Sequence, residues 1–236
     1  MKSTVALSEA DTRSDRIAIR TVDLRGPAGR LEALLNEGAP DSRYAALVCH
    51  PHPLGGGTLH NKVVYHAMKV LNGPEWGFRL PVLRFNFRGT GLSEGHHDGL
   101  AEAADVSAAV EWVRTEYSLP VVVVGFSFGA AMALVACCGR EPRPSASVHA
   151  LAALGLPTEG FGHQFRYPFL AGCNLPKLFL SGDRDWFAPK TDLERVVDTA
   201  AQPKKLVFVS GADHSFSGRL EAMQQPFADW LKEQVQ

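Results

Sequence analysis

The sequence predicts an α/β fold built on a doubly wound, mostly parallel β-sheet. Three observations indicate it: six unbroken apolar runs, helical patterns between them, and one apolar run that passes into a helix with almost no loop. Unbroken apolar runs are typical of strands covered on both faces, and their alternation with helices indicates right-handed βαβ crossovers. A chain of 236 residues fits one such domain with a sizeable core.

The chain is expected to open with a polar segment followed by an antiparallel hairpin. Residues 1–15 are polar and are expected to lack fixed structure, so the single domain is placed at residues 16–236. Alternating apolar and polar residues at 16–24 and 30–37 flank the sequence GPAG, which suits a tight reversal. These two segments are therefore predicted to pair as strands.

Strands and helices then alternate to the C-terminus. The apolar runs predict strands at residues 45–50, 82–87, 121–125, 148–155, 177–182 and 205–211. Apolar residues three and four positions apart predict helices at residues 60–71, 101–117, 128–138, 193–200 and 220–235. No internal repeat, low-complexity tract or linker divides the chain, which favours one domain.

Composition and charge narrow the class of protein. A net charge of -1 gives no broad electrostatic field, so neither nucleic acid nor a membrane is an expected partner. The N-terminus lacks the apolar core of a secretory signal, and no run reaches the roughly 18 apolar residues that span a bilayer, so a cytoplasmic location is expected. The four cysteines show no CxxC spacing and are expected to be buried thiols rather than disulfides or metal ligands.

The sequence GFSFG at residues 125–129 joins a predicted strand directly to a predicted helix. So sharp a turn strains the residue at its apex, and Gly125 and Gly129 remove the side chains that would collide there. The hydroxyl of Ser127 is then exposed above the sheet edge at a helix N-terminus. This setting favours a nucleophile over an ordinary N-cap.

A serine hydroxyl is a weak nucleophile that needs a base, and the base needs a third group to orient it. Three of the nine histidines follow Ser127, and of these only His214, in GADHSF, also follows an acid at the end of a strand. The turn SGDRDWFAP offers both Asp183 and Asp185 as that acid. The spacing alone does not choose between them.

Five segments occur in an informative order: CHPHPLGGGTLHNKV, RFNFRGTGLSEG, GFSFG, GDRDWFAP and GADHSF. On them the chain, from about residue 16 onward, resembles the small, capless branch of the α/β-hydrolase superfamily, the dienelactone-hydrolase-like and carboxylesterase-like proteins. The resemblance implies an eight-stranded sheet, the chain order serine, acid, histidine, and Asp185 as the acid of a GxxDxxxP turn. Dienelactone hydrolase itself would have a cysteine in place of Ser127, which argues against that particular lactone chemistry.

Acyl transfer also needs N–H donors for the oxyanion that forms on the substrate. The N–H of Phe128 follows the nucleophile directly, and a second donor is expected from the turn HPHPLGGGT. The two prolines of this turn have no N–H. Leu54 is therefore the expected second donor, with His52 or Gly55 as alternatives.

No cofactor and no metal are expected. The segments LGGGTLHNK and RGTGLSEG miss the phosphate-binding and dinucleotide-binding patterns. His50 and His52 lack further ligands at a zinc-binding spacing. Three polar residues are expected to support the loop beneath the active site: Asn86, Arg88 and Ser93.

The segment at residues 156–176 is too short for a helical cap but rich in aromatic residues. We expect Phe161, Phe165 and Tyr167 to line an open acyl pocket together with His52, which would favour short-chain esters. The alternative is that these aromatic side chains only cover the sheet edge.

The sequence therefore predicts a serine esterase that forms an acyl-enzyme on Ser127. A thioesterase or a serine peptidase would use the same machinery, and the sequence does not separate them. A ligand-binding protein with little turnover would show a broken triad, whereas all three members are present. The expected partner is a small-molecule ester, and a homodimer is the assembly we allow for.

Overall fold

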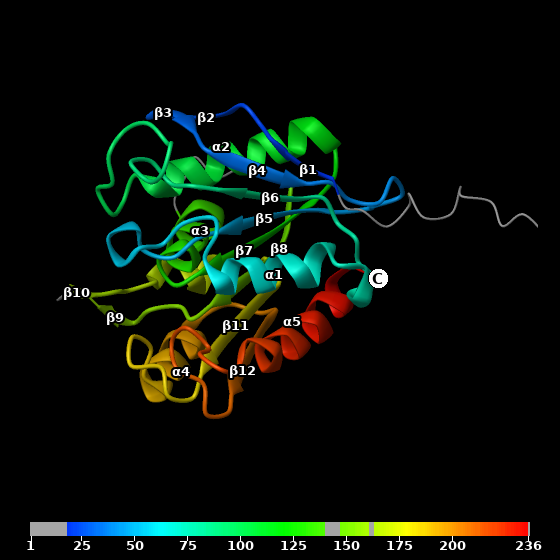
Figure 1. Cartoon of the computed structure of the whole chain (residues 1–236). Coiled ribbons are helices and arrows are strands. Elements are labelled where there is room, and N and C mark those ends of the chain that lie inside the picture. The colour runs from blue at the N-terminus through cyan, green and yellow to red at the C-terminus, as the bar shows by residue number, and fades with distance from the viewer. Residues whose placement is uncertain (1–17, 140–146, 161–162, 236) are drawn as a thin grey trace, which may run out of the picture.

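The computed structural model describes residues 18–139, 147–160 and 163–235, and these form the predicted α/β fold (Figure 1). Eight strands make one sheet in the order β1-β4-β6-β5-β7-β8-β11-β12. The pairings from β6 across to β12 are parallel, and both pairings of β4 are antiparallel. The strands of this sheet are β1 (Ile19–Thr21), β4 (Ala33–Asn36), β5 (Ala45–Cys49), β6 (Val82–Phe85), β7 (Val121–Phe126), β8 (Val148–Leu154), β11 (Lys177–Gly182) and β12 (Lys204–Val209).

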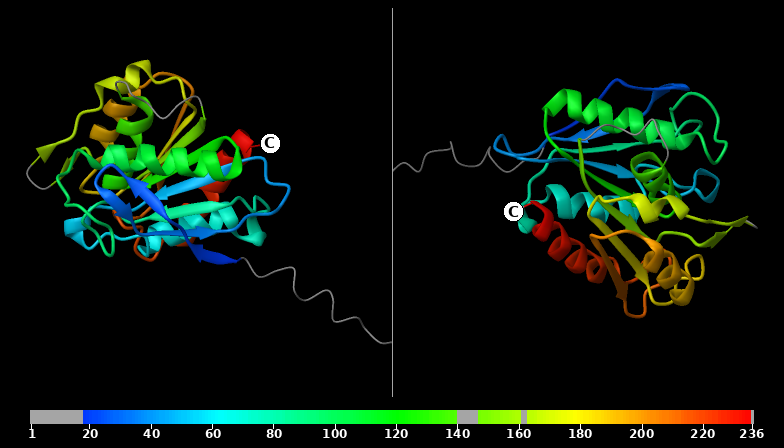
Figure 2. Two further views of the ribbon diagram at one scale, coloured as in Figure 1. Left: turned by 90° about the horizontal axis from the view of Figure 1, so that it is seen from above. Right: turned by 180° about the vertical axis from the view of Figure 1, so that it is seen from behind.

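Helices cover both faces of the sheet (Figure 2). One face packs against α1 and α5, and the other packs against α2, α3 and α4. The helices are α1 (Lys62–Asn72), α2 (Glu102–Tyr117), α3 (Phe128–Cys138), α4 (Lys190–Thr199) and α5 (Leu220–Val235), with short 3-10 turns η1 (Pro53–Gly55), η2 (Pro74–Trp76) and η3 (Pro168–Gly172). Each predicted helix and each predicted parallel strand is present, with ends shifted by no more than a few residues.

The central strand β7 shows why the apolar runs are unbroken. Val121 and Val123 are buried against the core under α2, α3 and α4, whereas Val122 and Val124 are buried in the core under α1 and α5. Since neither face of this strand meets solvent, no polar residue is needed at alternate positions. The same double coverage confirms the doubly wound sheet predicted from the sequence.

The predicted N-terminal hairpin is present in divided form. Strands β2 (Leu24–Gly26) and β3 (Gly29–Leu31) pair with each other in an antiparallel ladder, and the flanking strands β1 and β4 pair at the edge of the main sheet. The reversal falls at the GPAG sequence, as predicted. The polar segment expected at residues 1–15 lies outside the described residues, so the proposed domain boundary stays a prediction.

Between β8 and β11, the residues that the structure describes form no helical cap. These residues contain the short strands β9 (Glu159–Gly160) and β10 (His163–Gln164), which pair antiparallel, and the 3-10 turn η3. No helix of this described stretch therefore covers the C-terminal ends of β7, β11 and β12.

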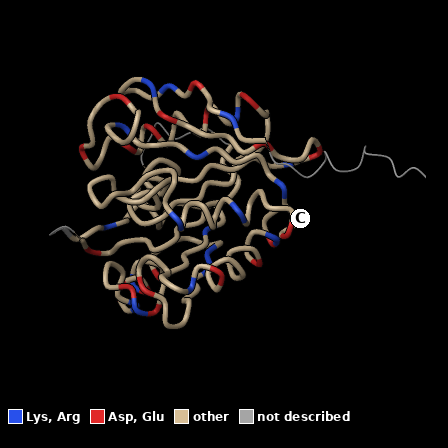
Figure 3. Tube along the Cα trace, viewed as in Figure 1, with Lys and Arg blue, Asp and Glu red and all other residues tan. Residues whose placement is uncertain are grey.

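Basic and acidic residues are interspersed along the trace in the view of Figure 3, in keeping with the net charge of -1. Among the described helices, none combines the length and the apolar character needed to cross a membrane.

The cysteines depart in part from the expectation of buried thiols. Cys49 and Cys137 are buried and free, as predicted. Cys138 and Cys173, however, form a disulfide, and their Cα atoms lie 5.2 Å apart. The pairing ties the end of α3 to the residue that follows η3, a proximity that the chain spacing does not reveal. Disulfides are rare in cytosolic proteins, so this pairing and the expected cytoplasmic location point in opposite directions.

We predict that Cys173→Ser lowers the free energy of unfolding by about 2 to 5 kcal/mol under oxidising conditions, as is typical when a native disulfide is removed. Thermal unfolding with and without a reductant measures this effect. Reductant should lower the melting temperature of the parent protein and leave that of the variant unchanged. Equal melting temperatures without reductant would show that the disulfide does not form.

Candidate active site

Ser127 occupies the turn between β7 and α3 with φ 54° and ψ −120°. A non-glycine residue rarely takes a positive φ, and such strained residues cluster at functional sites. The turn needs both neighbouring glycines: a Cβ on Gly125 would lie 2.4 Å from the Gly129 carbonyl oxygen, and a Cβ on Gly129 would lie 2.4 Å from the His50 carbonyl oxygen. The sequence GFSFG therefore folds as the predicted turn with Ser127 at its apex.

Ser127, His214 and Asp185 form one continuous chain of hydrogen bonds. His214 Nε2 lies 2.8 Å from Ser127 Oγ, and His214 Nδ1 lies 2.8 Å from Asp185 Oδ2. An ionised carboxylate can accept hydrogen bonds but cannot donate them. The hydrogen bond to Asp185 therefore assigns the proton of the neutral ring to Nδ1. Nε2 is then an acceptor for the hydroxyl proton of Ser127, as a general base must be.

Backbone and side-chain donors fix the carboxylate of Asp185, which is only 4% exposed. Its Oδ2 also accepts from Ser181 Oγ at 2.9 Å, and its Oδ1 accepts from the N–H groups of Phe187 and Ala188 at 2.9 and 3.2 Å. These bonds hold the orientation of the carboxylate toward the histidine.

Asp183, the alternative acid, binds a backbone N–H instead of His214. It is exposed, and its Oδ1 accepts from the Gly211 N–H at 2.7 Å, which links the turn after β11 to the turn after β12. The structure thus brings Asp185 to His214 and leaves Asp183 as a turn-forming residue.

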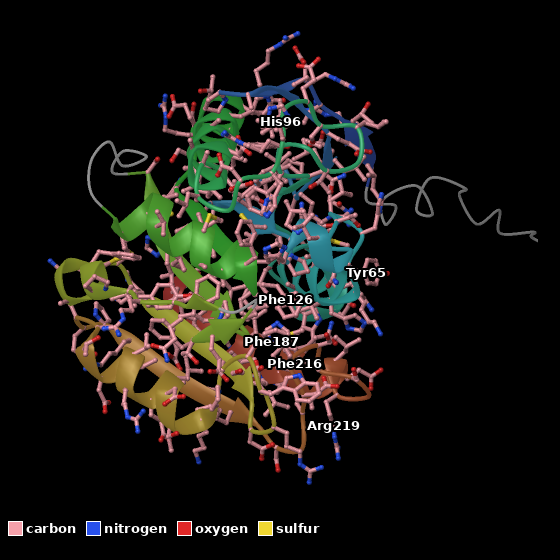
Figure 4. All side chains as sticks on the ribbon, turned by 90° about the vertical axis from the view of Figure 1, so that its left-hand side faces the viewer. Tyr65, His96, Phe126, Phe187, Phe216 and Arg219 are labelled. Atoms are coloured by element: carbon pink, nitrogen blue, oxygen red, sulfur yellow. A yellow bond between two sulfur atoms is a disulfide. The ribbon has the colours of Figure 1, made fainter. Side chains whose placement is uncertain are left out.

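Two aromatic rings hold the imidazole of His214. The ring of Phe187 lies 4.6 Å from it between centroids and that of Phe126 lies 5.2 Å from it. Phe126 and Phe187 are labelled next to each other in Figure 4, on the face of the molecule that carries the site. Gly155 lies close as well, since a Cβ there would be 3.4 Å from the imidazole. The ring therefore has little room to rotate away from Ser127.

A pocket of about 220 Å³ opens at Ser127. Its lining includes the aromatic residues Phe126, Phe165 and Phe187 and the polar residues His52 and Asn61. The full lining is Pro51, His52, Gly55, Asn61, Phe126, Ser127, Phe128, Pro157, Glu159, Gly160, Phe165, Phe187, His214 and Ser215.

Of the four residues expected to line this pocket, the structure places two in its lining. His52 and Phe165 do line it. Tyr167 does not: it is buried beneath the wall, where its hydroxyl donates to the Pro157 carbonyl at 2.7 Å. The expectation for Tyr167 was therefore wrong, because the tyrosine supports the wall from behind. Phe161 lies outside the described residues.

Several lining residues were missed by sequence reasoning. Phe126, Phe187 and Ser215 each lie within two residues of Ser127, Asp185 or His214, and that adjacency was the signal available. Pro157, Glu159 and Gly160 come from the stretch after β8, where only the aromatic residues had been singled out.

In the turn after β5, two of the N–H groups expected to bind the oxyanion are hydrogen-bonded within the turn. The Leu54 N–H donates to His52 Nδ1 at 3.2 Å, and Leu54 is 79% exposed and lies outside the pocket lining. The Gly55 N–H donates to the His52 carbonyl at 3.0 Å. Leu54 is therefore misplaced as an oxyanion donor, because its N–H caps the short turn η1 through the histidine ring.

His50 is a structural residue beneath this turn. Its Nδ1 lies 2.6 Å from the Pro51 carbonyl oxygen, to which it donates, and its Nε2 accepts from the Phe87 N–H at 3.0 Å. Both ring nitrogens are thus occupied, which leaves none for a metal. No group of three or more potential metal ligands occurs among the described residues.

The loop after β6 is supported by the polar residues expected for that role. Asn86 accepts from the Leu59 N–H at 2.7 Å and donates to Glu32 at 2.7 Å, and the Ser93 hydroxyl donates to the Asn86 carbonyl at 2.7 Å. Arg88 forms a buried ion pair with Asp105 at 2.6 Å. These bonds link the loop to α2 and to the N-terminal strands.

The chain is similar to known proteins over most of its length. Residues 79–234 match the family described as "Alpha/beta hydrolase domain". An uncharacterized protein of Rickettsia prowazekii is 34% identical over 218 residues, which cover 87% of this chain and 86% of that protein. Among solved structures, a serine hydrolase without lid from Xanthomonas campestris has 28% identity and a TM-score of 0.76, covering 92% of this chain and 95% of its own. A serine hydrolase homologue from Coxiella burnetii has 31% identity and a TM-score of 0.74, covering 89% and 96%.

We predict that His50 stays neutral well below pH 6. Burial lowers the pKa of His50 from 6.5 to about 4, so the unfolded chain binds the extra proton first as the pH falls. The contribution of His50 to stability is thus present above pH 6.5 and is lost between pH 6.5 and about 4, by up to about 3 kcal/mol. Ring-nitrogen NMR of the folded protein tests this, and a His50 titration near pH 6.5 would contradict it.

Proposed function

The chain belongs to the alpha/beta hydrolase family, and on that premise we propose that it hydrolyses carboxylic esters with Ser127 as nucleophile, His214 as general base and Asp185 as the residue that orients the base. The observation that carries the proposal is the continuous hydrogen-bonded chain from Ser127 Oγ to the buried carboxylate. The open pocket at Ser127 gives a substrate carbonyl access to that hydroxyl.

In the first step Ser127 Oγ forms a bond to the carbonyl carbon of the ester, and its proton moves to His214 Nε2. The carbonyl double bond becomes a single bond to an oxyanion. The Asp185 carboxylate, 2.8 Å from Nδ1, stabilises the imidazolium without taking its proton. The strained backbone of Ser127 holds the hydroxyl in place before the substrate arrives.

The oxyanion needs two aligned N–H donors. The N–H of Phe128 lies at the first residue of α3, where the helix dipole also favours negative charge. For the second donor we propose the N–H of His52 in place of Leu54. His52 lines the pocket together with Phe128, and their rings lie 5.0 Å apart between centroids, whereas Leu54 lies outside the lining.

Collapse of the oxyanion breaks the bond to the leaving alkoxide, which takes the proton from His214 Nε2. Water then attacks the carbonyl carbon of the acyl-enzyme and gives a proton to His214 Nε2. Collapse of the second oxyanion breaks the bond between that carbon and Ser127 Oγ, which takes the proton back from His214. No step requires a cofactor.

The size of the pocket favours substrates with short acyl groups. Its volume of about 220 Å³ lies below the 300 to 1,000 Å³ typical of sites for drug-sized ligands, and the described residues provide no cap to enclose a longer chain. Phe165 and Phe187 offer apolar surface for a few methylene groups.

We predict that Asp185→Asn lowers kcat/KM for a nitrophenyl ester by about 10³ to 10⁴, because the amide no longer holds the correct tautomer of His214. Asp183→Asn is the matched control and should change kcat/KM less than about threefold, because this exposed carboxylate only binds a backbone N–H. Steady-state kinetics on the three proteins measure both effects. A larger loss in the Asp183 variant would refute the assignment of the acid.

Nitrophenyl esters of increasing acyl length test the substrate class. We expect kcat/KM to be highest for acetyl to hexanoyl esters and to fall for longer chains, since the pocket is small and uncapped. A rate that rises up to palmitate would overturn the short-chain proposal. Faster turnover of a matched acyl thioester or peptide amide would move the assignment to those substrates.

A further inference from the structure

A second histidine–carboxylate pair, His97 with Glu102, lies beside the proposed oxyanion turn, and the mechanism above does not use it. His97 Nδ1 lies 2.6 Å from Glu102 Oε1. Glu102 is fully buried at the start of α2 and also accepts from the N–H groups of Asp98 and Gly99 at 2.9 and 3.0 Å. Its carboxylate is therefore fixed by three donors, and it fixes His97 in turn.

The ring of His97 touches the two residues whose N–H groups are the proposed oxyanion donors. Between ring centroids, His97 lies 4.7 Å from His52 and 5.3 Å from Phe128, and His52 lies 5.0 Å from Phe128. We name these three residues, His52, His97 and Phe128, the ring cluster. The cluster joins the turn after β5 to the first residue of α3.

The outer side of the turn faces solvent. Leu54, Gly55 and Gly56 are exposed, and a Cβ on either glycine would meet nothing within 4 Å. The His52 ring holds the turn from inside, because its Nδ1 accepts the Leu54 N–H. The direction of the His52 backbone is therefore tied to the direction of its ring, and the ring rests on His97.

We propose that His97 and Glu102 are positioning residues that set the oxyanion turn through the ring of His52. This inference rests on the proposed function, since it assigns the pair to the same site. An oxyanion donor acts only when it is aimed at the position the oxyanion will occupy, and losing one costs about 10² to 10³ in kcat. A donor that is present but held less rigidly should lower kcat by a smaller factor.

The test compares His97→Ala and His97→Phe with His96→Ala, a matched control at the exposed neighbouring histidine labelled in Figure 4. We expect His97→Ala to lower kcat for a short nitrophenyl ester by about 10- to 100-fold with KM changed less than about threefold. His97→Phe keeps a ring against His52 but loses the bond to Glu102, so it should lose an intermediate factor. Since a phenyl ring preserves the packing, it carries the test if the alanine variant melts at a lower temperature.

A double-mutant cycle decides whether His97 acts through His52. If it does, His97→Ala should lower kcat by less than about twofold when it is introduced into His52→Ala. The same fold loss in both backgrounds, an unchanged kcat, or a loss confined to KM would each overturn the inference. The parent protein is measured in the same assay, so that absence of ester turnover in the parent, which would refute the proposed function, is distinguished from failure of the positioning role alone.

Discussion

The geometry of the site depends on the backbone of Ser127. Its φ of 54° turns the chain from β7 into α3 within one residue, and the turn closes only because Gly125 and Gly129 have no side chains. The Ser127 N–H is tied to the Leu154 carbonyl at 2.8 Å, which anchors the strained residue to the neighbouring strand. One turn therefore places the hydroxyl, the Phe128 N–H and a helix N-terminus at a single point.

The parallel sheet supplies the other two members of the chain of hydrogen bonds. Since β7, β11 and β12 run in the same direction, the turns that follow them meet at one edge. Asp185 follows β11 and His214 follows β12, so residues 29 and 87 positions apart come within hydrogen-bond distance. The sheet is held by apolar burial on both faces, and bonds within the turns then fix Asp185 relative to His214.

Sequence reasoning could predict what local pattern and chain order determine. The strands, the helices, the Ser127 turn and the general place of His214 follow from apolar periodicity and glycine positions. The sequence-based predictions are wrong where side chains compete for backbone groups or point in directions that a sequence pattern does not record. Leu54 has the N–H that an oxyanion donor needs, but that N–H donates to the ring of His52. Tyr167 faces Pro157 rather than the pocket, and Cys138 meets Cys173 across 35 positions.

The most direct test of the account is reaction with a fluorophosphonate probe, followed by mass mapping of the adduct. A single adduct should form on Ser127 in the folded protein, and neither the denatured protein nor Ser127→Ala should react at that position. The absence of an adduct on folded protein, or an adduct on another residue at the parent rate, would contradict the assignment of Ser127 as the nucleophile.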